Sequence, residues 1–202
     1  LSSKTVGILG DQKKQNYAMR KDMTREEFIK EVTNGLLAPP AYFPLNVTLN
    51  KTGYQPVDEV IKKGAKALNV GEFKQIVKEK KALILDVRPQ FEFIEGFIPQ
   101  SIFIGLEGSF APWVGTLIKD IYQPIILVTP LGKEEEAVTR LSRVGFDNVL
   151  GFLQGGIEAW IKANYEVETL NSITAKVLQD KLTADALIFD VRKPIEYTDE
   201  HV

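Results

Sequence analysis

The strongest constraint on the fold is an alternation of short apolar runs with helical segments between residues 70 and 168. The runs are rich in β-branched residues and apolar on both sides, as expected of strands in a parallel sheet that helices cover on both faces. The pattern therefore predicts a doubly wound α/β domain built on a five-stranded parallel sheet. The apolar runs are ALILDV, SIFI, PIILV and NVLG, and the helical segments include GEFKQIVKEK, KEEEAVTRLSRV and GGIEAWIKA.

Two runs, Leu83–Val87 and Ile125–Val128, are expected at the centre of this sheet because they carry almost no polar side chains. Helical periodicity in the flanking segments selects the residues that should face the sheet. The predicted core consists of Leu83, Leu85, Ile104, Ile126, Val128, Leu141, Val149 and Trp160.

An internal repeat places a second, related segment near the C-terminus. The stretch LILDVRPQFEFIEGFI at residues 83–98 aligns without a gap with LIFDVRKPIEYTDEHV at residues 187–202, at a constant offset of 104 residues. A period of one domain length indicates tandem domains rather than a solenoid. Residues 169–202 are therefore expected to begin a second domain of the same kind, of which only the first part is present.

Residues 1–52 carry a different pattern. A short strand is expected around Thr5–Leu9, and a helix is expected to open at Thr24, because Glu27 completes a capping box three residues later. Pro39, Pro40 and Pro44 predict an extended segment after that helix. One strand and one helix bury too little surface to fold alone, so this piece should belong to a larger body.

Residues 53–69 are interpreted as a linker between the two parts, with an amphipathic, lysine-rich helix as the alternative form of residues 54–68.

The composition of the chain limits the classes of binding partner. The net charge of −2 offers no basic field for nucleic acid, and no apolar run is long enough to cross a bilayer. No signal peptide is recognisable, so a cytoplasmic location is expected.

Sulfur and metal chemistry are restricted by two residue counts. There is no cysteine, which removes disulfides, thiolate ligands and a sulfur nucleophile. There is one histidine, His201, and a single histidine does not make a metal site. No metal site is therefore expected within these residues.

Ordered motifs over residues 70–168 resemble the rhodanese sulfurtransferase domain. They are LDVRPQFEFIEGFIPQSIFI, the strand, loop and helix at residues 124–145, and LQGGIEAW. The resemblance implies a rhodanese-like fold, and residues 169–202 look like the opening of another such domain.

In active rhodaneses the loop after the central strand reads Cys-x-x-Gly-x-Arg, and the cysteine carries the persulfide. The resemblance places Thr129 at the cysteine, Gly132 at the glycine and Glu134 at the arginine. Threonine needs an adjacent base to act as a nucleophile, and the glutamates of TPLGKEEE repel an anionic donor while they favour the helix N-terminus. We therefore expect no catalytic residue here and a loop kept for folding.

Residues 1–52, through SSKTVGILGDQKKQN and PPAYFPLNVTLN, resemble the C-terminal end of a metallo-β-lactamase-fold domain of the persulfide dioxygenase and glyoxalase II kind. Such enzymes hold the acidic parts of a thiol cofactor with basic residues in this region. The resemblance thus makes Lys13, Lys14, Asn16 and Arg20 candidate substrate-binding residues, with a solvated basic surface as the equal alternative.

The order of domains is similar to bacterial persulfide dioxygenase/sulfurtransferase fusions, which implies a longer parent protein. That parent would use Fe(II), bound upstream of Leu1, to oxidise a low-molecular-weight thiol persulfide to sulfite. Sulfurtransferase activity would lie downstream of Val202, and a homo-oligomer is expected.

Two alternative functions remain open. One is a non-enzymatic rhodanese-fold docking module, favoured if Phe110, Trp113 and Val114 form an exposed patch. The other is a glyoxalase II-like thioester hydrolase with zinc.

The remaining polar motifs have structural interpretations. Asp86 and Arg88 at a strand end are expected to form a structural network that is linked to the following carboxylate, Glu92. In the rhodanese family that these motifs resemble, a histidine is common at the position of Phe97. The second copy keeps that histidine as His201, which is expected to be structural. Gly155 and Gly156 are expected to serve turn geometry and close packing rather than phosphate binding.

Overall fold

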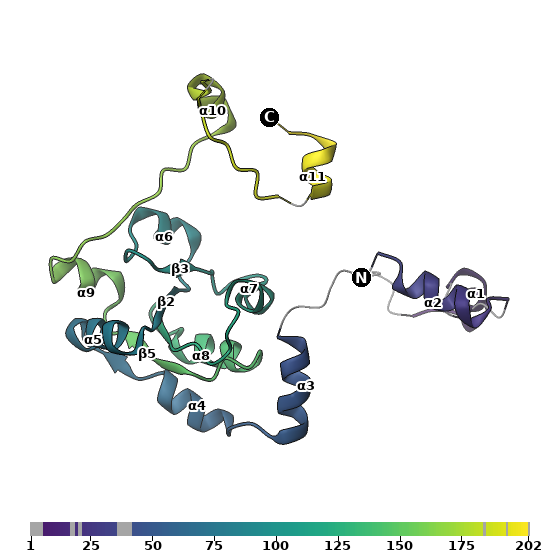
Figure 1. Ribbon diagram of the computed structural model, residues 1–202, viewed down its shortest axis with the longest axis horizontal. Coiled ribbons are helices and arrows are strands. Elements are labelled where there is room, and N and C mark those ends of the chain that lie inside the picture. The colour runs from purple at the N-terminus through teal and green to yellow at the C-terminus, as the bar shows by residue number, and fades with distance from the viewer. Residues whose placement is uncertain are drawn as a thin grey trace.

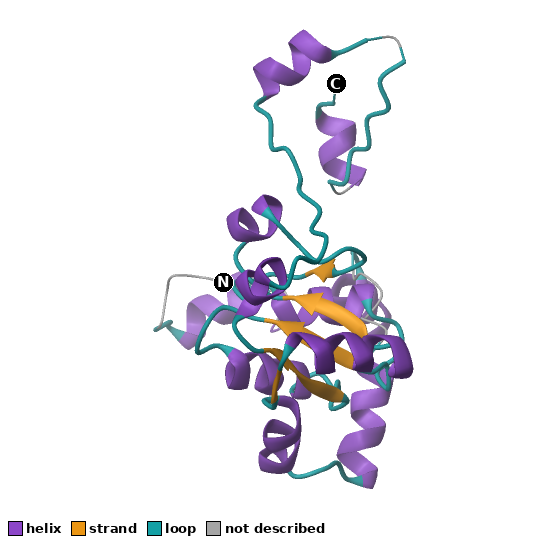
Figure 2. Ribbon diagram, turned by 90° about the vertical axis from the view of Figure 1, so that its left-hand side faces the viewer, coloured by secondary structure: helices purple, strands orange, loops and turns teal. Residues whose placement is uncertain are grey.

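The computed structural model describes residues 6–16, 19, 22–35, 42–183, 185–192 and 194–201 of the 202-residue chain. Its centre is a five-stranded sheet in which every pairing is parallel and the strand order is β1-β5-β4-β2-β3 (Figure 2). The predicted doubly wound α/β fold is confirmed. The strands are β1 (Ala67–Leu68), β2 (Leu83–Asp86), β3 (Ile102–Phe103), β4 (Ile125–Val128) and β5 (Val149–Leu153).

Helices cover both faces of the sheet because its inner strands present apolar side chains alternately to each side. On one face Leu85 and Leu127 pack with α4 (Val57–Gly64), α7 (Phe110–Leu117) and α8 (Glu134–Ser142). On the other face Ile84 and Ile126 pack with α5 (Val70–Lys80) and α9 (Gly156–Lys162). Figure 1 shows these helices around the strands. A short helix, α6 (Gln90–Glu95), follows β2 and stacks Phe93 on Phe97.

The predicted core agrees with the burial of these side chains. Leu83 is partly buried and packs against the core from the first residue of β2. The other seven predicted residues are buried, from 0% exposure at Leu85 to 7% at Trp160. Burial of one such aliphatic side chain contributes about 1.5–3 kcal/mol, so this cluster is a main source of the domain's stability.

The segment 53–69, interpreted as a linker from its composition, contributes two elements to the sheet domain. The alternative of an amphipathic helix is realised in α4, where Val60 is 1% exposed. A Cβ on Gly64 would lie 2.8 Å from Val138 Cγ1, so the glycine lets α4 approach α8 closely. The strand β1 pairs with β5 through Leu68 and supplies the fifth strand of the sheet.

The described residues of the N-terminal part include α1 (Leu9–Gln15), α2 (Arg25–Thr33) and α3 (Phe43–Thr52). The capping box at the start of α2 is confirmed, because Thr24 accepts from the Glu27 N–H and Glu27 accepts from the Thr24 N–H. Among the described residues of α1 and α2 none is buried.

Two expectations for this part are wrong where the structure describes it. Leu9 begins a helix instead of ending a strand, and residues 1–5 lie outside the described residues. The segment around Pro44 is helical, because proline is tolerated in the first turn, where its missing N–H would have no helical partner. Pro39 and Pro40 lie outside the described residues. Through Tyr42, Leu45 and Leu49, this region packs against the core of the sheet domain.

The C-terminal part contains α10 (Ala175–Lys181) and α11 (Pro194–Asp199). The internal repeat extends to hydrogen bonding. Arg88 donates to Asp86 and to the Gly96 carbonyl at 2.7 and 2.8 Å, and Arg192 donates to Asp190 and to the Glu200 carbonyl at 2.6 and 2.8 Å. All three positions keep the offset of the repeat. Among the described residues, no helix combines the length and apolar composition needed to cross a bilayer.

Candidate functional site

Polar side chains gather where β2, β4 and β5 end. The chain passes from β2 to β3 on one side and returns with β4 on the other side of β2, so the direction of winding reverses between β2 and β4. Crevices beyond the carboxyl ends of strands at such a reversal are the usual binding places in open α/β sheets. Arg88 follows β2 and Thr129 follows β4, which brings both to this crevice.

Arg88 is held in a buried network with Asp86. The guanidinium donates from Nε and Nη2 to both carboxylate oxygens, at 2.7 to 3.1 Å, and from Nη2 to the Gly96 carbonyl at 2.8 Å. The residues are only 4% and 0% exposed. This supports the structural interpretation of the pair. The expected link to Glu92 is wrong, because Glu92 does not join these hydrogen bonds and instead lies on the wall of the neighbouring cavity.

The β4–α8 loop carries the position predicted for a lost nucleophile. Thr129 is 7% exposed and is followed by a turn in which the Lys133 N–H donates to the Pro130 carbonyl at 3.1 Å. Gly132 adopts φ +79°, a left-handed conformation that glycine reaches without strain. The loop thus keeps the glycine-dependent turn that the resemblance predicts.

The N–H groups of this loop are not all available to an external anion. The Gly132 N–H donates to Glu134 Oε1 at 3.1 Å, so the protein's own carboxylate takes that donor. The Gly132 N–H is therefore not available to an anion beside Thr129. Glu134 and the next two glutamates form the first turn of α8, where negative charge favours the helix dipole.

Beside Thr129 lies a cavity of about 590 Å³. Three glutamates line it together with Arg88, whose charge is already paired with Asp86. An anionic sulfur donor would meet net negative charge here, and the side chains include no thiol. The charged and hydroxyl residues on its wall are Arg88, Glu92, Thr129, Glu134 and Glu158.

The paired glycines at the start of α9 also line this cavity. Gly155 and Gly156 have φ values of +76° and +61°, which only glycine adopts readily in succession. Their conformation explains the residues by turn geometry, as the sequence predicts.

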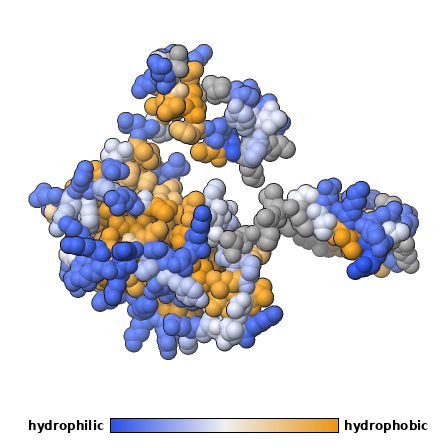
Figure 3. Space-filling model, viewed as in Figure 1, coloured by the Kyte–Doolittle hydropathy of each residue, from blue (hydrophilic) through white to orange (hydrophobic). Residues whose placement is uncertain are grey.

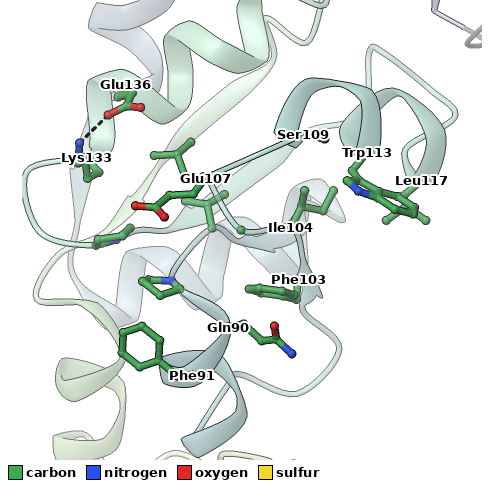
Figure 4. A pocket seen from close by; sticks show the side chains of 15 residues that line it. Gln90, Phe91, Phe103, Ile104, Glu107, Ser109, Trp113, Leu117, Lys133 and Glu136 are labelled. Carbon is green, nitrogen blue, oxygen red and sulfur yellow. Dashed lines mark hydrogen bonds and ion pairs between the residues drawn. The ribbon is translucent and has the colours of Figure 1, made fainter. Parts of the chain in front are cut away.

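A second, larger cavity of about 770 Å³ lies on the other side of Pro130, which lines both (Figure 4). Its wall is largely apolar, with Phe91 from α6, Phe103 from β3, and Trp113 and Leu117 from α7. Glu107 and Lys133 supply charge. Sequence reasoning did not identify this cavity. The sequence FAPWVGTL could have indicated it, because this short helix is apolar on all sides. One side packs on the core, and the other is left as an apolar surface.

Lys133 and Glu136 form an ion pair at the mouth of the second cavity. Lys133 Nζ donates to Glu136 Oε2 at 2.8 Å, and Arg140 lies 3.5 Å from the other oxygen. The hydrogen bond from Lys133 lowers the pKa of Glu136, and the same bond raises the pKa of Lys133. Both groups are therefore charged at neutral pH.

The exposed patch considered at Phe110, Trp113 and Val114 exists only in part. Phe110 and Val114 are completely buried in the core, because they lie on the face of α7 that meets the sheet. Trp113 is 55% exposed and faces the second cavity.

Three of the four candidate substrate-binding residues near the N-terminus lie within the described residues. Lys13 and Lys14 are exposed in the last turn of α1, and Asn16 follows that helix. Arg20 lies outside the described residues. Of the described residues in this set, Lys13, Lys14 and Asn16 line neither cavity.

No described set of residues fits a metal ion. Among the residues that the structure describes, no group of three or more His, Cys, Asp or Glu side chains could hold one. His201 stacks on Tyr197, and its Nδ1 lies 2.8 Å from the Tyr197 carbonyl. An Fe(II) or zinc site therefore has no ligand set in this part of the chain.

Comparison with known proteins finds a similarity in the sheet domain. Residues 69–163 match the family model described as the rhodanese-like domain. No curated protein matches the chain. A rhodanese-related protein from Thermoplasma volcanium is 27% identical, with a TM-score of 0.40, over 50% of this chain and 96% of that one.

A metallo-β-lactamase from Staphylococcus aureus subsp. aureus COL is similar over a longer stretch. It is 24% identical, with a TM-score of 0.54, and the match covers 72% of this chain. This chain spans 39% of the length of that protein. The similarity extends beyond the residues of the rhodanese-like domain, and at this identity it concerns the fold.

Proposed function

We propose that this chain is part of a multidomain sulfur-metabolism enzyme and that its rhodanese-like domain does not transfer sulfur. The absence of sulfur transfer is supported by Thr129, which stands at the start of the β4–α8 loop. It lies beside a cavity whose unpaired charges are carboxylates. Without a thiol there is no atom to hold a persulfide, and Glu134 opposes the anion that would deliver one. The domain then acts as a spacer or docking body.

For the parent we propose oxidation of a low-molecular-weight thiol persulfide. One persulfide, one dioxygen and one water give the thiol and sulfite with two protons. The outer sulfur is oxidised and dioxygen is reduced. We assign this reaction to an Fe(II) site in a metallo-β-lactamase-fold domain of the parent, and none of its steps to the residues described above. Similarity to a metallo-β-lactamase over 72% of the chain supports a parent of this composition. We further propose that the parent is a cytoplasmic homo-oligomer.

The test uses the intact parent protein. Metal content is measured first, and then dioxygen uptake and sulfite release with a thiol persulfide. We expect one iron per chain and equal amounts of dioxygen consumed and sulfite formed. Two zinc ions per chain with hydrolysis of a thiol ester, and no dioxygen uptake, would replace this proposal with the glyoxalase II-like hydrolase.

A docking module is the second candidate, and the cavity beside Trp113 favours it. Trp113 and Leu117 are 55% and 48% exposed on α7, and Figure 3 shows hydrophobic residues at the surface near α6 and α7. A parent without metal-dependent activity that still binds a ligand through this face would support the module instead.

A further inference from the structure

The cavity between α6, β3 and α7 combines aromatic walls with one carboxylate that has no partner among the described residues. Phe91, Phe103 and Trp113 surround an apolar space of about 770 Å³, which is within the range of small-molecule sites. Glu107 lies on the same wall. None of its oxygens takes part in a hydrogen bond or ion pair of the described structure, in contrast to Glu136 nearby, which binds Lys133 and Arg140.

Two cations, Lys133 and Arg140, and two carboxylates, Glu107 and Glu136, lie around the cavity. Lys133 is committed to Glu136 at 2.8 Å, and Arg140 is held by the carbonyls of Leu106 and Gly108. Glu107 is near enough for its negative charge to add to the raised pKa of Lys133. In the described structure neither cation donates a hydrogen bond to Glu107, so its carboxylate oxygens can accept one from a ligand.

The geometry separates a charged end from an apolar end. Figure 4 shows the Glu107 carboxylate directed toward the side of Lys133 and Phe91, away from Trp113 and Leu117. A cation beside Glu107 can also lie against the face of Phe91, which is 65% exposed, because aromatic faces attract cations. The rings of Phe103 and Trp113 remain for an apolar substituent.

We propose that this cavity binds a small organic cation, an ammonium group that carries an aryl or alkyl substituent. The ammonium group lies at Glu107 and the substituent lies between Phe103 and Trp113. The two cavities share only Pro130 among their described lining residues, and the proposal does not rest on the sulfur chemistry proposed for the parent.

Three probes of one shape test the charge preference. Phenethylammonium, phenethyl alcohol and 3-phenylpropionate present a cation, a neutral group and an anion on similar apolar bodies. Titration calorimetry measures their affinity, and tryptophan fluorescence locates binding, because Trp113 is exposed whereas Trp160 is 7% exposed in the core. We expect the cation to bind most tightly and the anion least, with a difference that decreases at high salt.

Two matched variants assign the preference to Glu107. Glu107→Gln keeps the shape and should weaken binding of the cation roughly fivefold, while leaving the alcohol unchanged. Glu135→Gln makes the same change of net charge on α8, outside both cavities, and should leave all three affinities unchanged. Trp113→Phe should remove the fluorescence change while the cation still binds in the calorimeter.

The proposal is overturned if the three probes bind equally, if the anion binds best, or if none binds. It is also overturned if Glu107→Gln and Glu135→Gln have the same effect. Both glutamates are exposed, so neither change should affect folding, and circular dichroism checks this.

Discussion

The carboxylate of Glu134 accepts a hydrogen bond from the backbone N–H of Gly132 at 3.1 Å. This contact lies in the loop where a rhodanese would hold an anionic sulfur species. The negatively charged carboxylate of Glu134 occupies a backbone N–H that such an anion could otherwise accept from. The absence of a cysteine and the presence of Glu134 therefore both oppose binding of a sulfur anion.

We expect that restoring sulfur chemistry requires two changes. Thr129→Cys alone should label weakly with thiosulfate, because Glu134 raises the thiol pKa and repels the donor. Adding Glu134→Arg frees the Gly132 N–H and supplies a cation, so the double variant should form a persulfide faster. Intact-protein mass spectrometry counts the added sulfur, and Thr129→Ser with Glu134→Arg is the control without a thiol. Equal, near-zero labelling of the single and double variants would contradict this account of the loop.

The repeated Asp-Arg pair allows the same substitution in two environments. Arg88→Ala should cost about 3–5 kcal/mol of unfolding free energy, because it leaves Asp86 buried without a partner. Arg192→Ala removes the equivalent pair, whose side chains are 45% and 21% exposed, and should leave the unfolding midpoint of the sheet domain nearly unchanged. Urea unfolding followed by circular dichroism measures both. Similar losses in the two variants would show that burial does not distinguish the pairs.

Close packing of α4 on α8 depends on Gly64. In Gly64→Ala the new Cβ would lie 2.8 Å from Val138 Cγ1 and 3.1 Å from Val149 Cβ, so we expect a loss of about 1–3 kcal/mol. Gly96→Ala is the control, because a Cβ there meets nothing within 4 Å and the φ of 176° suits alanine. Thermal unfolding of both variants provides the measurement. A Gly64→Ala protein as stable as the unaltered one would mean that α4 does not pack here.

The second Asp-Arg pair should be visible in a titration. Hydrogen bonds from Arg192 lower the pKa of Asp190 to about 2 from its usual 3.8. Because the pKa of Asp190 is lower in the folded protein, the contribution of this pair to the free energy of unfolding is present above pH 3.8. That contribution is lost as the pH falls toward 2. Carbon-detected NMR of the carboxyl group should give a midpoint near 2, and Arg192→Gln should return it toward the usual value. A midpoint of 3.8 in the unaltered protein would mean that the pair does not form in solution.

Local patterns in the sequence were sufficient for the fold class and for part of the site. The runs at Leu83–Val87 and Ile125–Val128 are short and apolar on both sides, which is typical of buried parallel strands. They form β2 and β4 at the centre of the sheet. The capping box at Thr24 was equally readable, because its two partners are three residues apart. The absence of a thiol at Thr129 required only the residue and its place in a motif.

What remained undetermined depends on residues far apart in the chain. Leu68 looks like part of a linker until it pairs with Leu153, and Tyr42 and Leu49 look unpartnered until the sheet core lies beside them. The second cavity needs Phe91, Phe103 and Trp113 from three elements, and no local spacing brings them together.

The sequence by itself therefore determined the parallel α/β class, the repeat at an offset of 104 residues and the missing sulfur nucleophile, because each is written in neighbouring residues or in composition. Only the tertiary structure decided the strand order β1-β5-β4-β2-β3, the inclusion of β1, and the cavity next to Glu107. The physical reason is that strand pairing and cavity walls arise from contacts between distant segments, whose free energies depend on the whole packed domain.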